Sequence, residues 1–265
     1  MSAMSQRSAS FWRTGSLWVW LLAGLILYLL ALIIMAPASL VPWYLARQGP
    51  QQPIILEDVQ GTLWQGSAAR AFWRGPTGPL EPLGQTQWRV HVLPLLVGKV
   101  KVSLRVNGPA GQMRMDLQPQ GQAYQLTDVT GKIPMTYLAS RLGQFSALDP
   151  KGTLVLDLPE LQFGPQGLQG RGRVDWQLAG FGLSPVNPLG NYRLNLQERQ
   201  LRLETLSGPL RLNARGEIES GSPRLRLDGT AQATGPQAAQ IQPVLSFLGP
   251  DQGNGVHAFN FNFSM

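Results

Sequence analysis

Cysteine is absent from this chain of 265 residues, and histidine occurs only at His91 and His257. Without cysteine the chain has no disulfide, no thiolate-bound zinc or iron–sulfur site and no thiol nucleophile. Histidine at two distant positions does not supply a histidine cluster for a metal. We therefore expect a chain that holds no metal and no cofactor.

Charged residues are also scarce, at 14% of the sequence, whereas about a quarter is usual for a soluble domain. The 22 basic residues exceed the 15 acidic ones and give a net charge of +7. Glycine and proline are plentiful, with 30 and 21 residues. This composition favours turns and short strands over long helices.

No charged residue lies between Arg13 and Arg47. Within this gap Leu17–Ala36 is an apolar run, and a helix of that length rises about 30 Å, the thickness of a bilayer's hydrocarbon core. Tryptophans lie near both ends of the run, where aromatic rings favour the headgroup zone. The sequence predicts a transmembrane helix over residues 14–38 that contacts the lipid bilayer through Leu17–Ala36.

Arg7 and Arg13 precede the apolar run, and no acidic residue occurs before Glu57. Because positive residues stay on the cytoplasmic side, we expect residues 1–13 to form a cytoplasmic tail and the rest of the chain to lie outside the cytoplasm. That topology excludes nucleic acid as a partner. The alternative is a signal peptide cleaved near Ala36-Pro37-Ala38, but the run is longer than a signal peptide's apolar region.

From Glu57 onward apolar and polar residues alternate. In Lys99–Val106 the even-numbered residues are valine or leucine and the odd-numbered ones are polar or basic. One-sided alternation is typical of antiparallel strands with one face on a core and one in water. The sequence therefore predicts a mainly β fold, in which an N-terminal single transmembrane helix is followed by a twisted antiparallel β-sheet domain.

Two stretches interrupt the alternation and predict one or two short helices. Residues 133–145 and 236–248 each contain proline and spaced apolar residues and follow a strand that ends in glycine. Their similar surroundings suggest two related halves, 57–151 and 152–265. The residues between the membrane helix and the sheet, 39–56, are expected to form a linker.

Catalytic patterns are missing from the sequence. No serine occurs in a G-x-S-x-G elbow, no phosphate-binding loop of the G-x-x-x-x-G-K type is present, and the acidic residues are scattered over polar strand positions. His91 and His257 are expected to lie at the surface or to contact a partner. We therefore expect no catalytic residue and no enzyme.

A G-T-L-W-x-G box follows the predicted helix, and a W-R-x-x-x-x-P-L-x-x-G pattern follows the box. The residues of these patterns are Gly61, Thr62, Leu63, Trp64, Gly66, Trp88, Pro94, Leu95 and Gly98. Trp88 is the first apolar residue of an alternating strand and is expected to lie in a core, the alternative being an interface anchor. In this order the anchor, the box and the second pattern resemble the protein N family of the type II (general) secretion pathway. The resemblance covers nearly the whole chain.

The resemblance implies a single-pass protein of the bacterial inner membrane in a Gram-negative envelope, with a periplasmic β domain over 57–265. It implies a non-catalytic subunit that contributes to assembly or stability of the machinery that exports folded proteins across the outer membrane. Its expected partners are other inner-membrane or periplasmic subunits of that machinery; whether it forms a homo-oligomer is left open. The candidate partner contacts are Trp73, expected to be exposed, and Lys99, Lys101 and Arg105. The alternative is an envelope protein that binds or bridges lipids in a β-groove.

Overall fold

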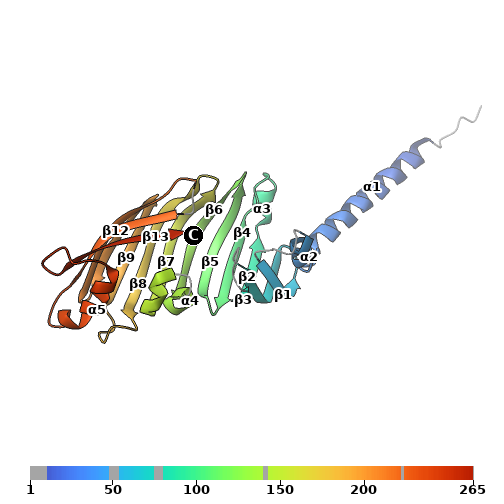
Figure 1. Cartoon of the computed structure of the whole chain (residues 1–265). Helices are drawn as coiled ribbons and strands as arrows, with labels where there is room; N and C mark the ends of the chain where they lie inside the picture. Colours follow the sequence, from blue (N-terminus) through green and yellow to red (C-terminus); the bar gives the residue numbers. More distant parts are fainter. Residues whose placement is uncertain (1–10, 48–53, 75–79, 140–142, 222–223, 265) are drawn as a thin grey trace, which may run out of the picture.

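One antiparallel sheet dominates the computed structural model, which describes residues 11–47, 54–74, 80–139, 143–221 and 224–264 (Figure 1). Over these residues the sheet has 13 strands, and each strand pairs with the next along the chain. The strands are β1 (Ile54–Gly61), β2 (Gln65–Arg74), β3 (Leu80–Val90), β4 (Val102–Gly108), β5 (Gly111–Gln120), β6 (Ala123–Pro134), β7 (Pro150–Gly164), β8 (Gly167–Phe181), β9 (Gly190–Glu198), β10 (Gln200–Ser207), β11 (Leu210–Ile218), β12 (Arg224–Ala233) and β13 (Val256–Ser264). The predicted mainly β, antiparallel fold is confirmed.

The helices are short apart from the first. They are α1 (Phe11–Ile34), α2 (Leu40–Arg47), α3 (Val92–Leu95), α4 (Met135–Ala139), the 3₁₀ helix η1 (Gly143–Leu148) and α5 (Ala238–Leu248). Helices predicted at 133–145 and 236–248 are therefore present as α4 with η1 and as α5. The sequence did not predict α2, α3 or the early start of β1: the expected linker 39–56 contains α2 and the first residues of β1.

Successive strands reverse direction, so their turns fall alternately on two rims of the sheet. The turns after β1, β3, β5 and β7 form one rim, which we call the α3 rim because α3 lies in the turn after β3. The turns after β2, β4, β6 and β8 form the opposite α4 rim. Figure 1 shows α3 and α4 on opposite sides of the sheet.

The strand register makes the predicted apolar face continuous across the sheet. One row of directly paired residues crosses every strand. It consists of Val59, Ala68, Thr86, Val106, Met113, Gly131, Leu156, Val174, Leu194, Leu203, Ala214, Gly229 and Phe259. We call this set the apolar row.

The ends of the apolar row are covered more completely than its middle. At the C-terminal end, Ile241, Val244 and Leu245 of α5 are buried in the main core beneath β8–β13. A small core at the other end contains Ala38, Ala68 and Trp88. Between them Met113 and Leu156 are half-buried, because neighbouring side chains of the same face shield them and no helix packs over them completely.

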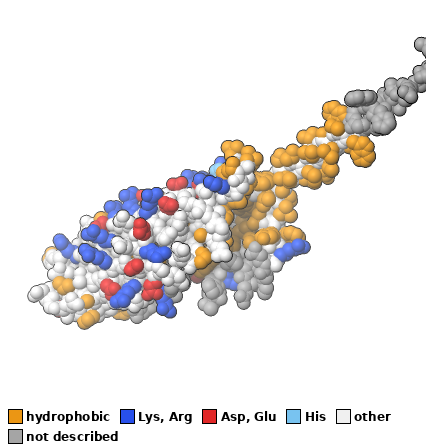
Figure 2. All heavy atoms as spheres, turned by 90° about the horizontal axis from the view of Figure 1, so that it is seen from above, with side chains coloured by type: hydrophobic (Ala, Val, Ile, Leu, Met, Phe, Trp, Pro, Cys, Tyr) orange, Lys and Arg blue, Asp and Glu red, His pale blue; other side chains and the backbone are white. Residues whose placement is uncertain are grey.

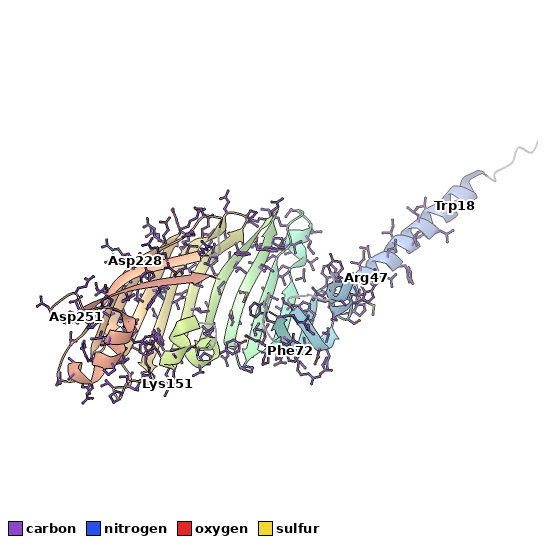
Figure 3. The ribbon with its side chains drawn as sticks, viewed as in Figure 1. Trp18, Arg47, Phe72, Lys151, Asp228 and Asp251 are labelled. Atoms are coloured by element: carbon purple, nitrogen blue, oxygen red, sulfur yellow. The ribbon has the colours of Figure 1, made fainter. Side chains whose placement is uncertain are left out.

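Helix α1 leaves the sheet at its β1 end, and α5 lies at the far end with Asp251 (Figures 1 and 3). The apolar side chains of α1 from Trp18 to Ile34 are mostly exposed, for example Leu27 at 67%. Among the residues that the structure describes, no helix has the length and apolarity needed to cross a membrane. The membrane span predicted over residues 14–38 is not confirmed and stays a prediction.

Candidate functional site

The G-T-L-W-x-G box forms the turn between β1 and β2. The Thr62 amide donates a 2.9 Å hydrogen bond to the carbonyl of Gln65, and the Thr62 hydroxyl accepts from the Gln65 amide at 3.1 Å. Gly61 has a φ of +95°, a left-handed conformation that suits glycine. A Cβ at Gly66 would lie 2.4 Å from the Trp88 indole. Both glycines of the box are therefore required by the turn and its packing.

The box holds the chain that leaves α1. The Leu63 amide donates to the Ala36 carbonyl at 2.8 Å, and the Ala38 amide donates to the Gly61 carbonyl at 3.1 Å. The Trp64 indole Nε1 donates to the carbonyl of Ile33 at 2.8 Å. Ile33 lies in the last turn of α1, where carbonyls lack partners within the helix. These bonds attach the end of α1 directly to the sheet.

Trp88 supports the box from the next strand. Its indole Nε1 donates to the Leu63 carbonyl at 3.1 Å, and the side chain is only 8% exposed. It packs with Ala38 from the α1–α2 connection and Ala68 from β2. The expectation that Trp88 lies in a core is confirmed. Trp64 and Trp88 therefore link α1, the box and β3 into one unit.

The second pattern forms the turn between β3 and β4. The Pro94 carbonyl accepts from the amides of Val97 and Lys99 at 3.1 and 2.9 Å, and the His91 amide donates to Lys101 at 2.9 Å. Gly98 has a φ of +72°. Pro94, Leu95 and Gly98 therefore build a tight turn around α3. Apolar side chains at the end of this turn point into solvent, which the motif alone did not predict.

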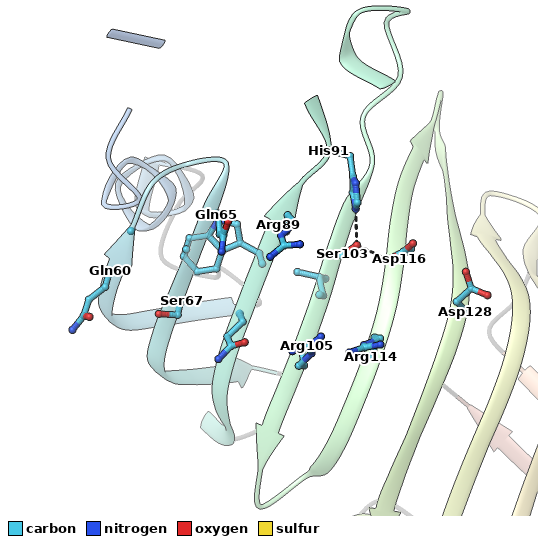
Figure 4. Close-up of a pocket in the computed structure, with 15 residues that line it drawn as sticks. Gln60, Gln65, Ser67, Arg89, His91, Ser103, Arg105, Arg114, Asp116 and Asp128 are labelled. Carbon is cyan, nitrogen blue, oxygen red and sulfur yellow. Dashed lines mark hydrogen bonds between the residues drawn. The ribbon is translucent and has the colours of Figure 1, made fainter. Parts of the chain in front are cut away.

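A polar network lies below α3, on the face of the sheet opposite to the apolar row (Figure 4). His91 Nε2 and the Ser103 hydroxyl are 2.8 Å apart, and that hydroxyl donates to Asp116 Oδ1 at 2.6 Å. Lys101 Nζ is 2.8 Å from Asp116 Oδ2. Burial would raise the pKa of Asp116, but its hydrogen bonds with Lys101 and Ser103 outweigh burial and hold the pKa below its usual range.

This network does not have the geometry of a nucleophile. In a serine hydrolase, histidine lies between serine and the acid and takes the serine proton. Here Ser103 lies between His91 and Asp116, and its proton is already bonded to the carboxylate. Lys101 is half-buried and paired with Asp116, and its role as a candidate partner contact stays a prediction. Among the described residues, no cluster of His, Cys, Asp or Glu could hold a metal ion.

An open hollow of about 850 Å³ is lined by this network, by Asp128 and by arginines from three strands. Arg89, Arg105 and Arg114 lie along the same face of β3, β4 and β5 in Figure 4. Arg105 and Arg114 are directly opposite in register, a like-charge pair that is unfavourable by itself. Within the described residues, no salt bridge joins any of these arginines to an acid. We call Arg89, Arg105 and Arg114 the arginine trio.

Some arginines elsewhere on the sheet are paired with acids. Arg193 makes bonds of 2.7 and 2.8 Å to both oxygens of Asp175, and Arg173 is 2.7 Å from Asp157. The hydrogen bond from Arg193 lowers the pKa of Asp175, against the opposing effect of burial. The arginine trio is therefore one part of this face that is suited to an anionic partner. Arg202 and Arg215 form a second like-charge pair in a hollow farther along the sheet, and no salt bridge joins either to a described acid. Sequence alternation placed Arg105 and Arg89 on the polar face, but it could not show that they converge with Arg114.

The candidate partner contacts do not form one patch. Trp73 is half-buried near the far end of β2 and pairs with Ile54 and Glu81, so the expectation that it is exposed is wrong. Lys99 is exposed beside α3, and Arg105 is exposed in the hollow. Each residue's partner role stays a prediction.

His257 also differs from its expected surface position. It is 3% exposed, and its Nδ1 is 2.8 Å from the Gly249 carbonyl. It pairs with Ala231 on the same face as Phe259, and Gln242 of α5 lies 3.3 Å from its Nε2, so α5 and the loop after it cover this end of β13.

Comparison with known proteins gives the family. The model of the type II secretion system protein N family matches residues 52–260. A protein N of Klebsiella pneumoniae is 30% identical over 158 residues, or 57% of this chain and 56% of the relative's length. A protein N of Aeromonas hydrophila is 28% identical over 239 residues, covering 87% of this chain and 92% of that protein.

The chain thus spans little more than half of the Klebsiella protein but nearly all of the Aeromonas one. No solved structure matches this chain. The matched region begins before β1 and includes the box, α3, the arginine trio and all strands up to β13. This chain therefore belongs to the type II secretion system protein N family.

Proposed function

We propose that this chain is a non-catalytic, single-pass inner-membrane subunit of the type II secretion system, and that it contributes to assembly or stability of the machinery. The observation that carries the proposal is the attachment of the box to α1. Hydrogen bonds from Leu63 and Trp64 to the end of α1 fix the helix to the sheet. A rigid connection between α1 and the sheet fixes the orientation of the sheet relative to the helix, which suits a subunit that presents a surface to partners.

Support for the membrane anchor comes from the sequence and from exposure. Leu17–Ala36 is uncharged, and Arg7 and Arg13 lie on the side expected to remain cytoplasmic. Exposed apolar side chains along α1, such as Trp20 at 74%, need an apolar surrounding. In this topology residues 39–265 lie in the periplasm.

The arginine trio is the proposed contact for an acidic surface of another secretion subunit. Its cations are exposed or lie in an open hollow, and no carboxylate of the described chain neutralises them by a salt bridge. An acidic partner would relieve the repulsion between Arg105 and Arg114 and gain charge-assisted hydrogen bonds. The polar face of β3–β5 would then be part of the assembly interface.

Photocrosslinking in cells tests this contact. A photoreactive amino acid placed at Arg114 should capture another secretion subunit, identified by mass spectrometry. The matched control is Arg211, an exposed arginine on β11 outside the hollow. Capture of no secretion subunit from Arg114 or Arg105, in cells that export normally, would contradict the proposed contact.

A second candidate function is lipid binding along the apolar row. The observation that favours it is the half-buried middle of the row, where Met113, Leu156 and Val174 form an apolar surface between the two cores. Such a surface matches acyl chains in chemistry. Purified full-length protein should then carry phospholipid in stoichiometric amount. The Met113→Asp variant should lose that lipid, whereas the Thr130→Asp variant, changed on the opposite face, should retain it. If the purified protein carried no lipid, the lipid-binding function would be contradicted and only the subunit function would remain.

A further inference from the structure

The turn between β3 and β4 ends in a cluster of exposed apolar side chains. Val92, Leu93, Leu96 and Val97 are 54%, 79%, 78% and 72% exposed. We call residues 92–97 the α3 tip. Isolated exposed apolar residues are common on protein surfaces, but four within six consecutive positions form a patch that marks an interaction site.

The exposure of the α3 tip follows from its hydrogen bonding. The Leu96 amide donates to Leu93 at 3.2 Å, the Val97 amide to Pro94 at 3.1 Å and the Gly98 amide to Leu95 at 3.0 Å. These bonds satisfy the backbone within the turn and direct the side chains outward. Pro94 and Leu95 of the same turn are half-buried.

The α3 tip is adjacent to the attachment of α1. The turns after β1 and β3 lie on the same α3 rim, and the Val90 amide donates to the Trp64 carbonyl at 2.7 Å. The indole of the same Trp64 donates to Ile33 in α1. One residue therefore connects the last turn of α1 with the strand that leads into the tip.

The figures place the tip and α1 on the same side of the molecule. In Figure 1, α3 rises at the end of the sheet from which α1 leaves, and in the perpendicular view of Figure 2 apolar side chains protrude there beside Lys or Arg. Helix α2 adds exposed aromatic rings at this end. Trp43 is 52% exposed with Arg47 stacked over it at 3.8 Å, and Tyr44 is 62% exposed. Amphipathic rings of this kind favour the membrane–water interface.

The charge around the tip is positive. Lys99 follows the tip and is exposed, Arg89 lies just before it, and neither makes a salt bridge with a described acid. Asp116, the acid of the network below, is already paired with Lys101. Cations beside an apolar tip match anionic lipid headgroups above an acyl region. This charge and the shared end with α1 favour a bilayer as the occupant.

We propose that the α3 tip inserts into the bilayer that α1 spans, with Lys99 at anionic headgroups. The inference depends on the proposed membrane anchor. The sheet is then attached at two points, through α1 and through the tip, and the α3 rim faces the membrane. Two attachments fix the tilt of the sheet and the direction in which the hollow opens.

Environment-sensitive labelling tests the insertion. The chain contains no cysteine, so single variants Leu96→Cys, Leu27→Cys and Leu183→Cys carry an NBD fluorophore at one site each. Leu27 reports on the anchor. Leu183 is an exposed control, at 58%, in the loop after β8 on the α4 rim.

The full-length protein is reconstituted in vesicles of phosphatidylcholine, alone or mixed with phosphatidylglycerol. We expect NBD at position 96 to show a severalfold rise and blue shift of emission, and quenching by shallow nitroxide lipids. Position 183 should report water. Water at 96 with lipid at 27 overturns the α3 insertion and leaves the anchor intact; water at 27 overturns the anchor itself.

A second measurement separates headgroup binding from apolar burial. Lys99→Gln, made in the labelled Leu96→Cys chain, should weaken the NBD response when phosphatidylglycerol is present and leave it nearly unchanged in phosphatidylcholine alone. The tip lies outside both cores, so circular dichroism should show an unchanged fold. An equal response of the Lys99→Gln and parent chains in both vesicles would overturn the proposed role of anionic headgroups.

Discussion

The indole nitrogen of Trp64 lies 2.8 Å from the carbonyl of Ile33, across 31 positions of sequence. This bond joins the box between β1 and β2 to the last turn of α1. The backbone of the same tryptophan accepts a hydrogen bond from Val90. A residue identified by its motif is therefore the physical connection between the predicted anchor, the sheet and the α3 tip.

Trp64→Phe should loosen this connection without unfolding the sheet. The change removes one donor and keeps an aromatic ring, so the loss is about 1 kcal/mol. Hydrogen exchange of the Leu63 and Ala38 amides should become faster, while exchange in β8–β12 stays unchanged. Trp43→Phe, at an exposed ring outside the box, is the control. Uniformly faster exchange in the Trp64 variant would show that the indole serves the whole fold and not the joint.

Gly66→Ala should be strongly destabilising. The added Cβ would lie 2.4 Å from the Trp88 ring and 2.9 Å from the Gln60 carbonyl. Overpacking of this kind costs about 1–3 kcal/mol, measured as the change in free energy of unfolding by urea. Gly24→Ala, where nothing lies within 4 Å of the added Cβ and φ is not positive, controls for the added methyl group. Equal losses at both positions would argue against the close contact with Trp88.

Arg114→Glu should place opposite charges across β4 and β5. Because Arg105 lies directly opposite, the variant should gain about 0.2–1 kcal/mol of stability. The same variant should reduce crosslinking from Arg105 to an acidic partner, because the arginine trio loses one cation and gains an acid. Thermal unfolding and in-cell capture measure the two effects. If position 105 still captured the partner in the Arg114→Glu variant, the change in stability would be unrelated to partner binding and the role of the arginine trio in binding would be contradicted.

Stability should fall at acidic pH in part through Asp175. Its folded-state pKa is lowered by the hydrogen bond from Arg193, so the interaction stabilises the fold above the ordinary aspartate pKa. That stability is lost as pH falls through the lowered folded-state value. Arg193→Met should therefore be less stable than the parent at neutral pH, and the difference should shrink on acidification below the ordinary aspartate range.

Urea unfolding over a pH series measures this prediction. Arg171→Met is the control, because Arg171 forms a single, more exposed contact with Glu160 at 3.0 Å. A difference between the Arg193 variant and the parent that stayed constant down to the most acidic pH would show that Asp175 is not the titrating group.

The sequence pattern predicted the structure correctly where a residue type occurs for a single physical reason. Alternation predicted the strands because an antiparallel sheet with one apolar face requires period two. Trp88 was predicted to lie in a core because it is the first apolar residue of an alternating strand, and its side chain is 8% exposed. Pro243 did not prevent α5, since Ile241, Val244 and Leu245 bury one face of that helix. Packing outweighed the propensity signal at this position.

The sequence pattern did not predict which residues from distant parts of the chain lie against one another in the fold. His257 was expected at the surface, but it lies on the same face of β13 as Phe259, and Gln242 of α5 and the loop at Gly249 cover it. Trp73 was expected to be exposed because alternation around it is weak, but pairing with β1 and β3 half-buries it. Lys101 was chosen as a contact on charge alone, and the fold places it against Asp116.

The sequence by itself determined the mainly β fold, the uncharged run at Leu17–Ala36 and the family motifs, because composition and periodicity record local requirements of backbone and solvent. Only the tertiary structure decided that the box holds α1, that the arginine trio converges and that the α3 tip is exposed beside α1. The reason is strand register. It brings residues from different turns and strands together, and the spacing of residues along one strand carries no information about its neighbours.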